Sequence, residues 1–184
     1  MSNKRLAVYC GARLGNKQKF ENAIIQLSNE MSKRQIDLVY GGGNVGLMGA
    51  IAKNVLKNNN QVFAIMPEFL QKIEGFEEKA QHTEIVENMS IRKQRMIDLS
   101  DYSLAMPGGP GTLEEITEVY SWHILDQIDN PCAFYNLDGY YQPMADMYDN
   151  MVSQGFLTME NRQKLFFSDS FEDIFDFFTT YNKV

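Results

Sequence analysis

The chain has 184 residues, of which 44% are hydrophobic and 22% are charged, a composition typical of one globular domain of ordinary size. Its formal net charge of −7 argues against general nucleic-acid binding, because phosphate backbones select basic surfaces. No apolar segment approaches the about 20 residues that a membrane-spanning helix needs. We therefore expect a single domain over residues 1–184 that binds neither nucleic acid nor membrane.

The cysteines and histidines indicate neither a disulfide nor a metal site. Cys10 and Cys132 each lie in an apolar run and lack metal-ligand spacing, which favours two buried thiols in a reducing compartment. His82 and His123 form no ligand cluster. The apolar start of the chain is short for a secretory signal and is better explained as a first strand. We predict a cytoplasmic protein without a metal.

Apolar runs alternate with helical patterns along the chain. The runs predict strands at 5–10, 36–40, 61–66, 83–87, 102–106, 132–136 and 164–167. Apolar residues at helical spacing predict helices at 17–34, 45–57, 89–100, 111–127, 140–153 and 171–181. Residues 68–81 have weak periodicity and predict a loop. The sequence does not decide whether this loop acts as a lid. This alternation predicts an α/β fold with a mainly parallel sheet and helices on both faces.

Two glycine-rich loops follow predicted strands, where parallel sheets bind their ligands. The first, YGGGNVGLMG at 40–49, satisfies GxGxxG, and we expect its backbone, including Gly42 and Gly43, to cradle a phosphate or ribose. A tight strand-to-helix turn without a ligand is the alternative. A dinucleotide-dependent oxidoreductase is a further reading, but the ribose-binding acid that it needs after the third strand is matched only by Glu68, directly after Pro67.

The second loop lies in AMPGGPGTLEEITEVY, residues 105–120. Its three glycines lack Cβ atoms, so a ligand can approach the main chain closely. Thr112 stands at the start of the following helix, where free amides and the helix dipole favour phosphate. Pro107 and Pro110 stiffen the turn and lower the entropy that binding costs. This loop therefore predicts a phosphate site.

The helix after this loop carries a carboxylate at the edge of its buried face. Glu115 lies one turn from the glycines, whereas Glu114 and Glu118 are expected to point to solvent. An inward carboxylate is costly unless it has a partner. Stabilisation by the helix dipole alone is the simpler explanation of Glu115. The functional reading places it beside the bound phosphate.

The segment NMSIRKQRM, residues 88–96, supplies cations for the same site. Arg92 and Lys93 share a helix face with Met89, and Asn88 or Ser90 can cap the helix just before them. An exposed basic turn is the alternative. The sequence thus combines two helix starts that favour phosphate with an inward arginine and an inward glutamate. This combination predicts a site for a phosphorylated sugar or nucleotide.

Four separated blocks, PGGPGTLEE, MSIRKQRM, IDLVYGGGNVGLMG and NLDGYYQPM, resemble those of the LONELY GUY (LOG) family over nearly the whole chain. Its members are cytokinin riboside 5′-monophosphate phosphoribohydrolases, often labelled lysine decarboxylases. The resemblance implies a Rossmann-like homodimer that hydrolyses the N-glycosidic bond of AMP or N6-modified AMP without a cofactor. The products are the free base and ribose 5-phosphate.

The resemblance also implies roles for single residues. Arg92 and Glu115 are the catalytic pair that it implies. The substrate contacts that it implies are Glu74, Arg92, Lys93, Gly108, Gly109, Pro110, Gly111, Thr112, Leu113, Glu114 and Ser121. Ala12 stands where relatives commonly have serine, so one hydroxyl contact is lost. A decarboxylase would need a Schiff-base lysine for pyridoxal phosphate, which nothing in the sequence supports. A non-catalytic nucleotide-binding or sensor module of the same fold is the alternative function.

Overall fold

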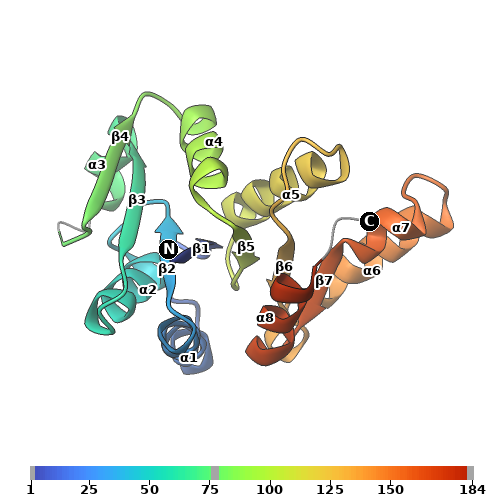
Figure 1. The fold of residues 1–184 in the computed structure, drawn as a ribbon, viewed down its shortest axis with the longest axis horizontal. Helices are drawn as coiled ribbons and strands as arrows, with labels where there is room; N and C mark the ends of the chain where they lie inside the picture. The colour runs from blue at the N-terminus through green and yellow to red at the C-terminus, as the bar shows by residue number, and fades with distance from the viewer. Residues whose placement is uncertain (1–2, 76–78, 182–184) are drawn as a thin grey trace.

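A seven-stranded parallel sheet forms the centre of the computed structural model, which describes residues 3–75 and 79–181, without the side chains of residues 73 and 74 (Figure 1). The strands are β1 (Lys4–Tyr9), β2 (Ile36–Tyr40), β3 (Val62–Pro67), β4 (His82–Val86), β5 (Tyr102–Ala105), β6 (Cys132–Tyr135) and β7 (Leu165–Ser168). Their order is β4-β3-β2-β1-β5-β6-β7, and every neighbouring pair is parallel. The predicted α/β class is confirmed.

Helices cover both faces of this sheet. They are α1 (Gln18–Lys33), α2 (Gly46–Lys57), α3 (Glu68–Glu74), α4 (Met89–Leu99), α5 (Pro110–Ile124), the 3-10 helix η1 (Leu137–Gly139), α6 (Gln142–Ser153), α7 (Met159–Gln163) and α8 (Phe171–Thr180). Figure 1 shows α4 and α5 on one face of the sheet and α1, α2 and α8 on the other. Among the described residues, no helix combines the length and apolar character that crossing a membrane requires.

Each face of the sheet carries its own hydrophobic core. Along β1, Leu6 and Val8 pack with α1, α2 and α8, whereas Ala7 and Tyr9 pack with α4 and α5. Side chains alternate between the two faces of a strand, so a strand covered on both sides must be apolar at every position. This explains why the strands read as continuous apolar runs.

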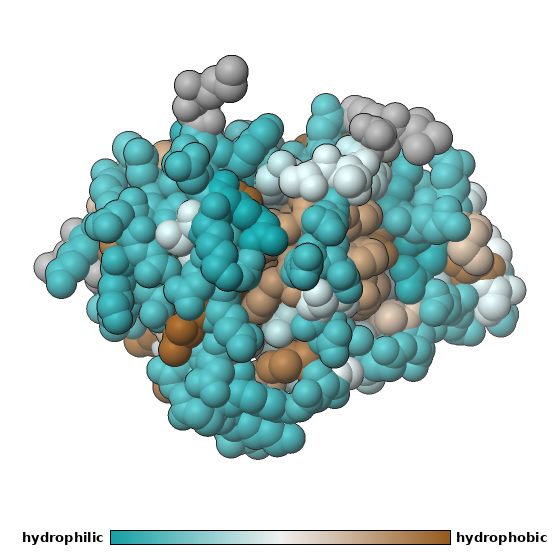
Figure 2. All heavy atoms as spheres, turned by 60° about the horizontal axis from the view of Figure 1, so that its bottom comes forward, coloured by the Kyte–Doolittle hydropathy of each residue, from teal (hydrophilic) through white to brown (hydrophobic). Residues whose placement is uncertain are grey.

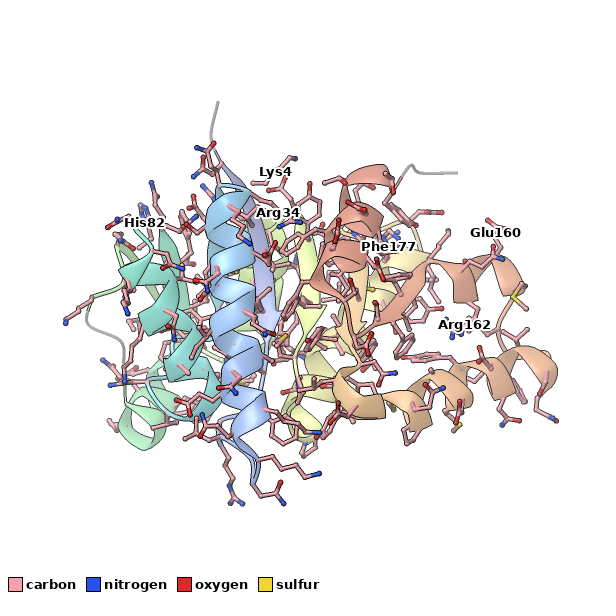
Figure 3. The ribbon with its side chains drawn as sticks, turned by 90° about the horizontal axis from the view of Figure 1, so that it is seen from below. Lys4, Arg34, His82, Glu160, Arg162 and Phe177 are labelled. Carbon is pink, nitrogen blue, oxygen red and sulfur yellow. The ribbon has the colours of Figure 1, made fainter. Side chains whose placement is uncertain are left out.

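On the face formed by α1, α2 and α8, polar and charged side chains surround the hydrophobic residues. Figure 2 shows hydrophobic residues gathered in the middle of this face and hydrophilic residues around them. Arg34, which ends α1 and is labelled in Figure 3, lies over the ring of Phe175 in α8, with Cζ 4.6 Å from the ring centroid. The guanidinium of Arg34 therefore joins α1 to α8 through Phe175, and it also forms an ion pair with Glu30 of α1.

Besides the 3-10 helix η1, two short α-helices were not expected from the sequence. Residues 68–74 form α3 instead of the predicted loop, and the helix ends at Gly75, whose φ of 68° lies in the left-handed region. Helix α7 has only five residues and starts where the Thr158 side chain accepts a hydrogen bond from the Asn161 amide. Both helices are too short for apolar periodicity to indicate them. Residues 76–78 of the predicted loop lie outside the described part.

The order of the strands creates a switch point beside β1. The chain runs outward from β1 through β2 and β3 to β4, and then returns to β5 on the opposite side of β1. The connections after β1 and β5 therefore lead away in different directions, which opens a crevice at the carboxyl ends of these strands. Across it, the Gly11 amide donates a hydrogen bond to the Pro107 carbonyl at 3.2 Å.

Candidate active site

A cavity of about 990 Å³ lies at this switch point. Its polar wall comes from the loop after β1, the loop after β5 with the first turns of α5, and the first turn of α4. Apolar and aromatic side chains complete the lining, namely Leu14, Phe20, Leu47, Met48, Leu70, Met89 and Tyr140, and are called the apolar wall below. Such a combination of an apolar wall and converging polar groups is typical of small-molecule sites.

The start of α5 presents main-chain amides to this cavity. Gly109 is the N-cap, no side chain caps the helix, and Pro110 occupies the first turn. The other amides of that turn have no acceptor inside the helix, so they are available to an anion. A Cβ atom added at Gly109 or Gly111 would meet nothing within 4 Å. Both glycines thus leave open space in front of the helix start.

Two tyrosines from the segment after β6 hold the loop before α5. The Tyr140 hydroxyl donates to the Gly108 carbonyl at 2.6 Å, and the Tyr141 hydroxyl donates to the Met106 carbonyl at 2.7 Å. At Gly108, a Cβ atom would lie 2.7 Å from the Thr112 Cβ, so this position requires glycine. The loop is therefore fixed before any ligand arrives.

Arg92 enters the cavity from the first turn of α4. Asn88 caps that helix by accepting a hydrogen bond from the Ile91 amide at 3.0 Å, which places Arg92 one turn inside. The guanidinium is buried, with the residue 5% exposed. Its Nη1 atom lies 3.3 Å from Glu115 Oε1 and 3.6 Å from the Met89 sulfur. Two charges from different helices thus meet at the cavity floor.

The Nε atom of Arg92 is buried and makes no hydrogen bond to the protein within the described residues. An unpaired buried donor costs about 1–3 kcal/mol, so such groups are rare unless a ligand uses them. The Nε–H group is thus an unsatisfied buried donor of a residue that lines the cavity.

The negative charge of Glu115 influences the two groups at the end of β1. Burial, followed by the Glu115 charge, raises the pKa of the Tyr9 hydroxyl and of the Cys10 thiol. Both groups therefore stay protonated near neutral pH. Cys10 lines the cavity, but its protonated thiol is a weak nucleophile, since only a thiolate is a strong one. Glu115 remains as the reactive group beside Arg92.

The sequence matches a known family over most of its length. Residues 48–178 fit the protein-family model described as "Possible lysine decarboxylase". Cytokinin riboside 5′-monophosphate phosphoribohydrolase LOG1 of Arabidopsis thaliana is 40% identical over 155 residues, which cover 84% of this chain and 73% of that protein. The chain belongs to the LOG family. The probable cytokinin riboside 5′-monophosphate phosphoribohydrolase LOGL1 of Oryza sativa subsp. japonica is likewise 40% identical, over 86% of this chain and 71% of that protein.

Solved structures with the same fold have far less sequence in common with this LOG chain. The molybdenum cofactor binding protein from Rippkaea orientalis has a TM-score of 0.70 at 15% identity and covers 98% of each chain. The Moco carrier protein from Chlamydomonas reinhardtii has a TM-score of 0.63 at 14% identity over 90% of this chain and 88% of that one. These likenesses establish the Rossmann-like fold alone.

The family description "Possible lysine decarboxylase" finds no support in the geometry of this LOG site. A pyridoxal phosphate enzyme needs a lysine that can form a Schiff base with the cofactor. Among the described residues, those that line the cavity include Arg13 and Arg92 but no lysine. Lys93, the neighbour of Arg92, is held in ion pairs by α5.

The cavity brings together most of the site residues that the sequence indicated. Those that line it are Arg92, Gly108, Gly109, Pro110, Gly111, Thr112, Glu114 and Glu115. The contact of Arg92 with Glu115 joins positions 23 residues apart, as the helical pattern of α4 and α5 suggested. The expected Glu74 contact concerns a side chain outside the described part of the LOG chain.

The first glycine loop does not form the expected cradle in this cavity. Gly42 and Gly43 are buried and do not line it. The amides of Leu47 and Met48 at the start of α2 donate instead to the Gly11 carbonyl, at 3.0 and 3.4 Å. These two amides are thus engaged by the protein's own main chain, and a phosphate or ribose contact at Gly42 and Gly43 stays a prediction.

Lys93 lies between α4 and α5 and does not line the cavity. It forms ion pairs with Glu114 and Glu118, and its Nζ atom lies 2.6 Å from Glu118 Oε2. Glu118 is therefore not solvated as the sequence analysis expected, because its side chain is only 29% exposed. The side chains of Leu113 and Ser121 also point elsewhere, Leu113 into the core and Ser121 to the Thr117 carbonyl.

Sequence reasoning overlooked Tyr140 and Gly41. Tyr140 lines the cavity and fixes the loop before α5, and its only signal was its place in the block NLDGYYQPM. Gly41 follows β2, and the Arg92 guanidinium lies directly against its α-carbon side. The pattern GxGxxG drew attention to phosphate binding and gave no indication of this contact.

Proposed function

We propose that this LOG-family chain hydrolyses the N-glycosidic bond of AMP or N6-modified AMP, and releases the free base and ribose 5-phosphate. Eight relatives between 36% and 40% identical are named cytokinin riboside 5′-monophosphate phosphoribohydrolase, some of them as probable. The observation that carries the proposal is the buried pair of Arg92 and Glu115, 3.3 Å apart, in one cavity with the open start of α5.

The phosphate of the nucleotide binds at the start of α5. The amides of Gly109, Gly111 and Thr112 supply hydrogen-bond donors, and the positive end of the helix dipole favours the anion. The phosphate is remote from the bond that breaks. Its binding energy can therefore hold the ribose in the reacting position.

Glu115 acts at the sugar. Cleavage of the glycosidic bond develops positive charge at C1′ and the ring oxygen, as in other glycoside hydrolyses. The Glu115 carboxylate stabilises this charge and orients a water molecule that attacks C1′. The water oxygen forms the new bond to C1′, the bond to the base nitrogen breaks, and the base leaves with a proton.

Arg92 positions both the carboxylate and the nucleotide. Its guanidinium favours the ionised form of Glu115, because an opposite charge at this distance stabilises a carboxylate. The guanidinium, which belongs to a residue lining the cavity, donates a hydrogen bond to an oxygen of the sugar. The role of Arg92 is thus electrostatic and does not require proton transfer.

The apolar wall of the cavity receives the base. Leu14, Phe20 and Tyr140 line this side, and the volume of about 990 Å³ lies at the upper end of the range for small-molecule sites. Plain AMP leaves part of such a space unfilled. The cavity thus admits a substituent on N6 and supports activity on both substrates, including AMP nucleosidase activity.

We also propose that residues 1–184 act as one nucleotide-binding domain and that the active form is a cytoplasmic homodimer. The resemblance to the family supports the dimer. Cys10 and Cys132 are both free and buried, which is compatible with a reducing compartment. Sedimentation velocity of the purified chain tests the dimer, and a monomer at micromolar concentration would contradict it.

The proposed activity is tested by incubating the protein with AMP or N6-isopentenyl-AMP and separating the products by chromatography. We expect free base and ribose 5-phosphate in equal amounts. Retention of intact nucleotide, with binding detected by calorimetry, would instead identify a non-catalytic binding module. A wild-type preparation treated with excess ribose 5-phosphate serves as the inhibition control.

A further inference from the structure

The first glycine loop has a role that phosphate binding does not explain. It follows β2, but the amides at the start of α2 are already bonded to the Gly11 carbonyl, and Gly42 and Gly43 do not line the cavity. Gly42 has a φ of 81° and so requires glycine for its backbone conformation. The requirement at Gly41 must be different, because its φ is not positive.

At Gly41 the space that a side chain would fill is occupied by Arg92. A Cβ atom added there would overlap Nη2 of Arg92 and would lie 2.7 Å from Cζ and 3.1 Å from Nε. Real Cβ atoms essentially never approach another heavy atom within 3.0 Å. The guanidinium therefore rests on the bare α-carbon of Gly41 and cannot keep this place beside any other residue.

The polar contacts of Arg92 are too few to hold it there without this packing. They are a separation of 3.3 Å to Glu115 and a contact of 3.6 Å to the Met89 sulfur, a weak acceptor. The buried Nε makes no hydrogen bond within the described residues. Close packing on Gly41 is thus what fixes the plane of the guanidinium and directs its N–H groups.

We propose that Gly41 is a positioning residue, which sets the reacting geometry by seating the Arg92 guanidinium against Glu115. This inference rests on the proposed hydrolase function for its kinetic part and on geometry alone for the contact. The first glycine loop then serves to position Arg92, and the second glycine loop, before α5, binds the phosphate. Gly41 itself does not touch the substrate.

The contact is tested by a double-mutant cycle with Gly41→Ala and Arg92→Ala, read out by thermal unfolding without substrate. In the wild-type background, Gly41→Ala lowers the unfolding temperature because its methyl group collides with the guanidinium. In the Arg92→Ala background the methyl group fits into the space left free, and the unfolding temperature does not fall further. Contacting residues are expected to show such coupling.

Gly49→Ala is the matched control for this cycle. Its Cβ atom would collide with the main chain of Asn44 and does not meet Arg92. It is expected to lower the unfolding temperature equally in both backgrounds. If Gly41→Ala also lowers the unfolding temperature equally in both backgrounds, the proposed contact is overturned. This result does not depend on any enzymatic activity.

Kinetics with AMP test the functional part. A misplaced guanidinium is expected to lower kcat about tenfold or more. KM is expected to rise less than kcat falls, because the displaced guanidinium weakens one contact to the sugar while the phosphate loop is untouched. The acid limb of the profile of kcat/KM against pH moves to higher pH, because Glu115 loses its stabilising charge. A kcat and acid limb like those of the wild type would refute the positioning role. If the wild type releases no base, the proposed function fails, and the unfolding cycle alone decides the contact.

Discussion

Glu115 and Arg92 owe their closeness to the ends of two helices that belong to the same face of the sheet. The two residues lie 3.3 Å apart, and the Glu115 side chain is only 11% exposed. A buried carboxylate is tolerated when a cation compensates it. At the scale of single residues, we therefore propose that the reaction depends on the charge of this pair.

Glu115→Gln tests this dependence on charge. The amide keeps the size of the side chain but cannot stabilise an oxocarbenium-like sugar, so we expect kcat for base release to fall by about 10² or more. Binding of ribose 5-phosphate, measured by calorimetry, should stay within a few-fold of the wild type. Glu160→Gln, on α7 at the far end of the molecule (Figure 3), is the charge-matched control and should keep full activity.

Gly109 and Gly111 allow stability and binding to be separated. Alanine at either site adds a methyl group that meets nothing within 4 Å, and neither φ is positive. At Gly111, inside α5, the unfolding temperature should stay the same or rise slightly, since alanine is the better helix former. At the N-cap Gly109 it should stay the same or fall slightly, since alanine is the poorer N-cap. Binding of inorganic phosphate should weaken at least about tenfold, because the methyl group takes the place of the anion. Unchanged phosphate binding in both variants would locate the anion elsewhere.

At the scale of elements, the position of α4 relative to α5 decides whether the site exists. Lys93, one position after Arg92 on α4, pairs with Glu114 and Glu118 on α5, which lie one position before and three positions after Glu115. The paired glutamates raise the pKa of Lys93 against the opposing effect of its burial. The cation thus stays charged and keeps the two helices in register.

Asn88 is the element-scale test, because it caps α4 directly before Arg92. Asn88→Ala should lower the free energy of unfolding by about 1 kcal/mol and also lower kcat, since the first turn of α4 loosens. Asn88→Ser should restore both. Ser170→Ala removes the equivalent cap of α8, whose hydroxyl accepts from the Asp173 amide, and should cost similar stability without changing kcat. An equal loss of kcat in both alanine variants would indicate a general stability effect.

At the scale of the whole molecule, the predictable and unpredictable parts differ in physical origin. Strands such as β2, with all five residues buried, were evident because both faces are covered. The helices α3 and α7 were missed because one or two turns carry too little periodicity. The motif that contains Gly42 and Gly43 likewise does not reveal that the Gly11 carbonyl accepts hydrogen bonds from the amides of Leu47 and Met48 at the start of α2. Such long-range main-chain contacts leave no local pattern in the sequence.

Acid should destabilise the whole fold. Hydrogen bonds to Lys33 and Arg34 lower the pKa of Glu30, and a hydrogen bond to Arg95 lowers the pKa of Glu84, each from 4.5. A carboxylate with a lowered pKa in the folded state stabilises the protein above its unfolded pKa, and this stability is lost as the pH falls through the folded pKa. We expect the unfolding temperature, followed by circular dichroism, to be constant near neutral pH and to fall below about pH 4.5. An unchanged unfolding temperature at pH 3 would contradict this.

The two tyrosine hydroxyls on the carbonyls of Met106 and Gly108 have a consequence for anion selectivity. A peptide unit carries its oxygen and its N–H on opposite sides. With the Gly108 oxygen anchored by Tyr140, the N–H of Gly109 must face the other way, and the unit cannot rotate without breaking that bond. The carbonyl oxygens of Met106 and Gly108, which would repel a dianion, already accept hydrogen bonds from the two tyrosines. The turn can therefore bind a negatively charged group without rearranging.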